Sequence, residues 1–193
     1  MKKDYSEWIT RERLIAEEVL WKKEVKEGKG NALIAKHAQM LCIRYGLKTV
    51  IEVGCGTAWI PTLLKNVMYV GLDANPICLE YAKRKNPNHL FVGPIDFREF
   101  KTENYFDLVI CFSTLKHFKL HEWVKIYQKV LSLGRYSIVT MNIAQNKFSQ
   151  RAEFTHSWVT MQDIRKATKE VRHRIIHKEW MNQSEMIIGT EHV

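Results

Sequence analysis

Residues 49–61, TVIEVGCGTAWIP, constrain the fold more than any other stretch of this chain. The stretch opens with β-branched residues, which favour a strand, and the strand ends in Gly54-Cys55-Gly56. We expect a tight turn at the glycines and a short helix from about Ala58 to Lys65, with Pro61 in its first turn. A strand, a glycine turn and a helix in this order usually hold a nucleotide-like ligand at the turn. The stretch therefore predicts a ligand site beside the two glycines.

Length and composition favour one ordinary globular domain. A chain of 193 residues can bury a continuous core, and we expect a single domain with N-terminal helices over residues 1–46 and an α/β core over residues 47–193. Hydrophobic residues at 46% and charged residues at 26% exclude a disordered or fibrous class. The net charge of +9 favours anionic partners such as RNA, phosphorylated small molecules or acidic peptides, with solubility as the alternative explanation.

The cysteines indicate a reducing compartment. They lie far apart in apolar surroundings, with neither a CxxC pair nor histidines at zinc-ligand spacing, at positions Cys42, Cys55, Cys78 and Cys111. We therefore expect reduced, buried thiols and no metal. The N-terminus has no apolar signal region, and no apolar run approaches the roughly 20 residues of a membrane span. These features predict a soluble cytoplasmic protein without a membrane partner.

Two amphipathic helices are predicted ahead of the first strand. Apolar residues recur at three- and four-residue steps over residues 6–27, and Ser6 is the expected cap of this helix. A glycine-containing break follows, and the second helix is expected from a cap at Asn31 to its end near Gly46. Trp8 and Trp21 are interpreted as packing residues. The alternative is that the first helix forms a lid over a pocket.

Strands and helices alternate through the rest of the chain. The predicted strands cover residues 68–72, 90–92, 107–112, 136–141, 173–180 and 185–190, and the predicted helices follow Asn75 and cover residues 120–131 and 160–169. Such alternation implies right-handed crossovers and a doubly wound, mostly parallel α/β sheet with helices on both faces. The last two strands are joined by only a few residues and must be antiparallel, because a parallel connection needs a dozen or more.

Two acidic residues follow two successive predicted strands. Asp73 comes about 20 residues after Gly54, a separation at which a carboxylate accepts hydrogen bonds from ribose hydroxyls. Capping of the next helix is the alternative role, but Asn75 already serves that end. Asp96 suits the amino group of an adenine held between apolar neighbours, or it caps a short helix. Trp59 occupies the third glycine position of a dinucleotide fingerprint, which argues against a nicotinamide cofactor.

Four segments in order resemble the class I S-adenosylmethionine-dependent methyltransferases: EVGCGTA (52–58), GLDANP (71–76), PIDF (94–97) and FDLVICFSTLKHF (106–118). The resemblance spans about residues 30–190 and implies a Rossmann-like, seven-stranded sheet whose last strand is antiparallel. It also implies S-adenosylmethionine as the cofactor and in-line transfer of its methyl group. The acidic and glycine motif of the family matches Glu52, Gly54 and Gly56, with Ala58 in place of the last glycine.

The resemblance further implies roles for individual residues. Asp73 matches the ribose acid and Asp96 the adenine acid, while the glycine turn passes close to the methionine part of the cofactor and the next helix starts near its carboxylate. The expected cofactor-binding residues are Glu52, Gly54, Cys55, Gly56, Asp73, Ala74, Asp96, Phe97, Cys111 and Phe112. His117 is the candidate general base, because an unperturbed histidine pKa of about 6.5 suits proton removal near neutrality. Its alternative role is to shape the pocket.

The methyl acceptor is the least constrained part of the prediction. The fourth strand lacks the Asp/Asn-Pro-Pro-aromatic ending of the amino-methylating branches, and CFSTLKHF is similar to small-molecule branches. The loop over residues 142–158 contains Lys147, Arg151, His156 and Trp158, and we expect it to roof the acceptor site together with the N-terminal helix. A basic roof favours an anionic small molecule, with ordinary surface polarity as the alternative. An RNA methyltransferase and a catalytically idle cofactor-binding partner protein are the rival functions, and no oligomeric state is predicted.

Overall fold

The structure is a computed structural model that describes residues 11–143, 158–181 and 185–193. These residues form two compact units, divided between Thr102 and Glu103. Strands and helices alternate in each unit, as the sequence predicts. Ser6, Trp8 and the three basic residues of the predicted roof lie outside the described residues.

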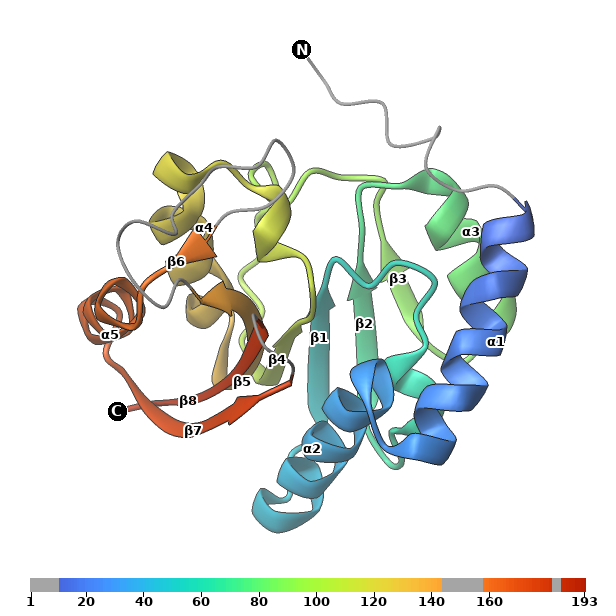
Figure 1. Ribbon diagram of the computed structural model, residues 1–193, viewed down its shortest axis with the longest axis horizontal. Coiled ribbons are helices and arrows are strands. Elements are labelled where there is room, and N and C mark those ends of the chain that lie inside the picture. The colour runs from blue at the N-terminus through green and yellow to red at the C-terminus, as the bar shows by residue number, and fades with distance from the viewer. Residues whose placement is uncertain (1–10, 144–157, 182–184) are drawn as a thin grey trace. The chain divides into compact units, whose positions relative to one another are not determined.

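The first unit is a parallel sheet of order β3-β2-β1 with helices around it (Figure 1). Both β1 and β2 are buried over four of their five residues, so their apolar side chains form the core of this unit. The three strands have the predicted bounds. The elements of the unit are α1 (Arg11–Glu27), α2 (Gly30–Tyr45), β1 (Thr49–Val53), η2 (Ile60–Leu63), β2 (Met68–Leu72), α3 (Pro76–Lys85) and β3 (Leu90–Val92).

The start of α2 differs from the prediction. The helix begins at Gly30, so Asn31 is inside it and is not its cap. Instead, the Glu24 carboxylate of α1 accepts hydrogen bonds from the backbone N–H and the side-chain amide of Asn31, at 2.8 and 3.2 Å. A side chain of the preceding helix thus satisfies an N–H group that every helix leaves free at its start. The predicted end is confirmed, because Gly46 caps α2 with a left-handed φ of 65°.

The helix predicted from Ala58 to Lys65 is wrong in type and length. The chain forms only the 3₁₀ turn η2 there, with Pro61 near its start. Ala58 is left-handed, with a φ of 52°, and Leu64 returns to an extended backbone, so helical geometry is confined to four residues. A turn this short aligns few peptide dipoles. The expected attraction between a helix start and a cofactor carboxylate therefore loses its structural basis.

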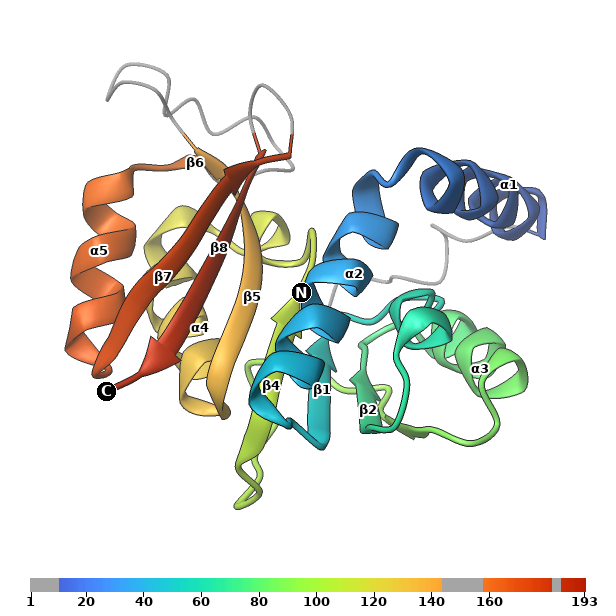
Figure 2. The same ribbon diagram turned by 90° about the horizontal axis from the view of Figure 1, so that it is seen from below.

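The second unit is a mixed sheet of order β4-β5-β8-β7, with β6 paired to β5. β4 and β5 are parallel, whereas β8 is antiparallel to both β5 and β7, which confirms the predicted antiparallel last strand. Figure 2 shows α4 and α5 beside this sheet. The elements of the unit are β4 (Phe106–Cys111), η3 (Leu115–His117), α4 (Leu120–Ser132), β5 (Gly134–Ile143), β6 (Trp158–Val159), α5 (Met161–Glu170), β7 (His173–Trp180) and β8 (Glu185–His192).

Local signals in the second unit are largely confirmed. β7 has the predicted bounds, whereas β5 (Gly134–Ile143) is two residues longer than predicted at each end. Both ends of the loop predicted over residues 142–158 are therefore strand, since β5 includes Ile143 and β6 begins at Trp158. α5 starts where the prediction puts it, because Thr160 and Asp163 form a reciprocal capping box. β4 is buried over five of its six residues, as a nearly continuous apolar run predicts.

The described residues also bear on redox state and membrane contact. All four cysteines are buried, as expected, and none forms a disulfide bond. None of the helices described here combines the length and hydrophobicity needed to cross a bilayer.

Candidate functional site

The glycine loop (residues 54–58) leaves β1 through the predicted tight turn. Gly54 and Gly56 have left-handed φ angles of 73° and 52°. The backbone N–H groups of Gly54 and Cys55 both donate to the Leu72 carbonyl of β2, at 2.7 and 3.0 Å, which fixes the start of the loop against the neighbouring strand. A Cβ added at Gly56 would meet no heavy atom within 4 Å. Open space therefore borders the loop backbone at this glycine, as a ligand that approaches the main chain requires.

Asp73, directly after β2, is hydrogen-bonded to the glycine loop. Its Oδ2 accepts from the Gly56 N–H at 2.7 Å and its Oδ1 from the Asn75 N–H at 2.8 Å. Burial raises the pKa of Asp73, and the N–H groups of Asn75, Gly56 and Ala74 oppose that shift. Helix capping falls to Asn75 as predicted, because its side chain accepts from the N–H groups of Ile77 and Cys78 at the start of α3.

The segment after β3 approaches Asp73 closely because of Gly93, a residue that the sequence analysis did not single out. Gly93 has a φ of 130°, and a Cβ there would lie 2.3 Å from the Asp73 carbonyl oxygen. The same carbonyl accepts a hydrogen bond from the Ile95 N–H at 3.1 Å. Only glycine allows this contact, which brings the ends of β2 and β3 together at one edge of the sheet.

Asp96 and Phe97 have other partners in this structure. The Asp96 carboxylate pairs with the Arg98 guanidinium, with a shortest contact of 2.7 Å, and also accepts from the Arg98 backbone N–H at 2.9 Å. The segment forms a hydrogen-bonded turn, without the short helix that was the alternative prediction. Phe97 is 5% exposed and stacks on Phe100 with ring centroids 6.3 Å apart, so little of its ring faces solvent.

Glu52 is buried in the middle of the first unit and hydrogen-bonded to another side chain. Tyr69 of β2 donates its hydroxyl to the Glu52 carboxylate. Burial raises the pKa of Glu52 to about 8, against the opposing effect of the Tyr69 hydrogen bond. Tyr69 pairs with Val50 in the strand register, two residues from Glu52, which is a diagonal position on the sheet. This partner was not predicted, although the alternation of inward- and outward-facing side chains along both strands could have indicated it.

Side chains of α1 contact the glycine loop and the residue after it. Thr57 donates its hydroxyl to Glu17 at 2.9 Å, and Trp21 stacks on Trp59 with ring centroids 5.7 Å apart. These contacts confirm a packing role for Trp21. The sequence did not predict the Glu17 contact, and it placed this helix near the site only as the alternative lid and as part of the acceptor roof.

The Lys85 ammonium, at the end of α3, lies against an aromatic wall. Its Nζ is 3.1 Å from the centroid of the Trp59 ring and 5.3 Å from that of Tyr81. Among the described residues, neither this nitrogen nor the buried indole nitrogen of Trp59 has a hydrogen-bond partner. Burial lowers the pKa of Lys85 to about 7, partly countered by Glu17. The cation–π contact is therefore the main interaction of this ammonium in the described residues.

Ala58, which replaces the last glycine of the family motif, keeps a left-handed backbone with a φ of 52°. For an L-residue this conformation costs about 1–2 kcal/mol. Two features offset the cost. The Ala58 methyl is fully buried, and the Ala58 carbonyl accepts a hydrogen bond from the Asn86 amide at 3.0 Å.

The remaining predicted site residues belong to the second unit. Cys111 is the buried last residue of β4, and Phe112 follows it half-buried. The next residue, Ser113, donates its backbone N–H to the Thr140 hydroxyl of β5 at 2.8 Å, which fixes the start of the following turn. His117 ends η3 and is exposed, so its imidazole is accessible to solvent, as a general base for an incoming substrate would be.

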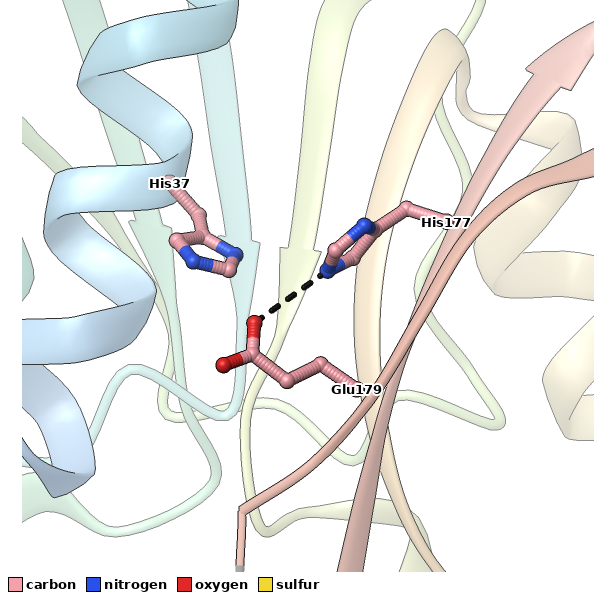
Figure 3. Close-up of side chains that lie close together, drawn as sticks. All are labelled: His37, His177 and Glu179. Carbon is pink, nitrogen blue, oxygen red and sulfur yellow. Dashed lines mark hydrogen bonds and ion pairs between the residues drawn. The ribbon is translucent and has the colours of Figure 1, made fainter.

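The second unit also carries a polar pair on β7, outside the predicted site residues. His177 Nε2 and Glu179 Oε2 are 3.3 Å apart, and their side chains are 47% and 42% exposed (Figure 3). Exposed pairs of this kind contribute little to stability.

Comparison with known proteins assigns the family. Residues 50–136, from β1 into β5, match the family described as a methyltransferase domain. Residues 50–136 thus belong to a methyltransferase domain, and the chain has the fold of S-adenosylmethionine-dependent methyltransferases. The predicted family, the Rossmann-like α/β fold and the cofactor S-adenosylmethionine are thereby confirmed, and a methyl acceptor is implied. No curated protein matches the chain.

Solved structures share the fold of this methyltransferase. Magnesium protoporphyrin IX methyltransferase from Synechocystis, solved with S-adenosylmethionine, is 17% identical over 90% of this chain and 84% of its own, with a TM-score of 0.69. An S-adenosylmethionine-dependent methyltransferase from Clostridium acetobutylicum is 12% identical over 93% and 98% of the two chains, with a TM-score of 0.71. A small RNA methyltransferase is 17% identical over 84% of this chain but only 25% of its own, with a TM-score of 0.64.

Proposed function

We propose that this protein transfers the methyl group of S-adenosylmethionine to a small anionic acceptor, with the cofactor lying along the glycine loop. The observation that carries the proposal is the hydrogen bond from the Gly56 N–H to the Asp73 carboxylate. It joins the two motifs that recognise the cofactor in this family. The open space at Gly56 supports a ligand at the same place.

Asp73 is the residue to which we assign the cofactor ribose. Its Oδ2 accepts the Gly56 N–H and its Oδ1 the Asn75 N–H. A carboxylate has about four acceptor sites, so it can also accept a ribose hydroxyl. Asp96 is assigned to the adenine amino group, which would compete with Arg98 for the same oxygens. Glu52, Cys55, Ala74, Phe97, Cys111 and Phe112 remain predicted neighbours of the cofactor.

When bound, S-adenosylmethionine supplies a methyl group on a positively charged sulfur. The protein then mainly has to orient the two reactants, and good orientation alone gives effective molarities of about 10⁵–10⁸ M. We assign His117 to proton removal from an acceptor that arrives protonated, because its imidazole is exposed. The small-molecule acceptor is supported by the name of one structural neighbour, magnesium protoporphyrin IX methyltransferase, and by the absence of the amino-methylating signature after β4. An anionic acceptor is supported by the net charge of +9.

Two measurements test the proposal. Mass spectrometry of small molecules released from freshly purified protein should find S-adenosylmethionine or S-adenosylhomocysteine. Turnover is then measured on a panel of carboxylated and phosphorylated small molecules. It should fall at least tenfold in His117→Ala, with unchanged cofactor affinity. His121→Ala, at an exposed histidine, is the matched control. Unchanged turnover in His117→Ala would remove the base assignment, and binding without transfer to any acceptor would favour an idle cofactor-binding partner.

An RNA acceptor is the second candidate. The net charge of +9 and the fold shared with a small RNA methyltransferase favour it. Phosphate contacts make RNA binding strongly dependent on salt. Methylation of RNA with an affinity that falls steeply between 50 and 200 mM salt would therefore support this acceptor over a small molecule.

A further inference from the structure

Ala58 holds a backbone conformation that suits glycine better. Its φ is 52°, and its methyl group packs in a buried cluster with Cys55, Leu79 and Ala82. A left-handed alanine tends to relax to the ordinary right-handed region unless its surroundings prevent it. Besides this burial, a contact from outside the glycine loop can stabilise the Ala58 conformation.

Asn86 provides that contact. It is the residue after α3, it is 7% exposed, and its backbone N–H caps the helix by donating to the Ala82 carbonyl at 2.9 Å. Its side-chain amide donates to the Ala58 carbonyl at 3.0 Å and to the Ala82 carbonyl at 3.3 Å. One buried carboxamide thus links the end of α3 to the glycine loop, 28 residues away in the sequence.

Ala58 also closes the turn that contains Gly56. The Ala58 N–H donates to the Cys55 carbonyl at 2.8 Å and closes a turn whose two central residues are Gly56 and Thr57. Within this turn, the Gly56 N–H donates to the Asp73 carboxylate at 2.7 Å. A rotation of the backbone at Ala58 would move the end of the turn and with it the Gly56 N–H.

We propose that Asn86 is a positioning residue for the glycine loop: by binding the Ala58 carbonyl, it keeps the turn in the shape in which Gly56 meets Asp73. Asn86 touches neither Gly56 nor Asp73 through any contact described above, and it lies outside the four family motifs. Its effect on cofactor binding rests on the proposed function, whereas its effect on the loop does not.

The test compares Asn86→Ala in two backgrounds, the wild type and Ala58→Gly. Glycine adopts the left-handed conformation without help, so Ala58→Gly removes the need for Asn86. One readout is the exchange rate of the Gly56 amide hydrogen in the ligand-free protein, followed by NMR. The other is the affinity for S-adenosylhomocysteine, measured by calorimetry. Asn88→Ala, an exposed asparagine two residues further on, is the matched control.

In the wild-type background, Asn86→Ala should speed exchange of the Gly56 amide and weaken S-adenosylhomocysteine binding, each by about tenfold. This is the effect expected when the Ala58 carbonyl loses its buried hydrogen bond from Asn86. In the Ala58→Gly background both effects should shrink to about twofold or less. Asn88→Ala should change neither readout.

Equal losses in the two backgrounds, or no loss in either, would overturn the proposal, because Asn86 would then act only as the cap of α3. If Asn86→Ala does not fold, Asn86→Asp replaces it, since a carboxylate of the same size cannot donate to the Ala58 carbonyl. Failure of the wild type to bind S-adenosylhomocysteine would contradict the proposed function, and the exchange comparison would still decide the role of Asn86.

Discussion

Replacing Asp73 by asparagine separates the structural role of this side chain from its proposed role in cofactor binding. In the ligand-free protein the carboxylate accepts N–H groups from Gly56 and Asn75, one on each oxygen. A carboxamide has one oxygen, so its NH₂ group must face one of these donors. A hydrogen bond to a charged group contributes about 1.5–3 kcal/mol. Burial raises the pKa of Asp73, so the neutral amide regains part of this loss.

The free energy of unfolding of Asp73→Asn should therefore fall by about 1–2 kcal/mol. For a chain of 193 residues this corresponds to a melting temperature lower by about 2–8 °C. Cofactor affinity should fall further, because two ribose hydroxyls lose a charged acceptor, a loss of about 3 kcal/mol or more and hence on the order of 10²-fold in Kd. Asp73→Ala, which keeps no acceptor, should abolish measurable binding.

Differential scanning fluorimetry and calorimetry with S-adenosylmethionine measure the two effects separately. Glu80→Gln is the matched control, because it removes one carboxylate from the exposed face of α3, where Glu80 is 3.8 Å from Arg84. A Kd within threefold of the wild type for Asp73→Asn would refute the ribose assignment. An unchanged melting temperature would refute the structural role of its hydrogen bond to the loop.

Two further predictions concern pH. Burial raises the pKa of Glu52 to about 8, so its contribution to stability is complete below its unfolded value near 4.5 and is lost as pH rises towards 8. In urea unfolding, the stability of Glu52→Gln relative to the wild type should therefore increase by on the order of 2 kcal/mol from pH 5 to pH 7. A difference in stability that does not change with pH would contradict the buried, protonated state. Burial lowers the pKa of His173 to about 4, and its Nδ1 lies 3.0 Å from the Thr190 hydroxyl. The contribution of neutral His173 to stability is complete above the unfolded pKa of about 6.5 and is lost as pH falls towards 4. The free energy of unfolding of the wild type should therefore fall by about 2 kcal/mol from pH 7 to pH 5 relative to His173→Gln. Parallel curves of stability against pH for the two proteins would contradict this prediction.

Signals that act within a few residues were sufficient to predict most elements. β-branched residues predicted β1 with its observed bounds, and Asn75 followed by Pro76 predicted the start of α3. Gly46 likewise predicted the end of α2. These signals succeed because capping and turn preferences depend on the residue and its neighbours in the chain. The prediction of a helix over residues 58–65 failed because Ala58 adopts a conformation that its own side chain disfavours.

The sequence by itself determined the family, the order of elements and the acids expected at the ends of β2 and β3, because each depends on residue type and spacing. Tertiary structure decided how the glycine loop is held. Three hydrogen bonds join the loop to distant residues: Gly56 to Asp73, Ala58 to Asn86 and Thr57 to Glu17. The paired residues are 17, 28 and 40 positions apart in the sequence. No local preference specifies such pairs. They form only when β1, β2, α3 and α1 have packed, because packing alone brings these donors and acceptors within 3 Å of one another.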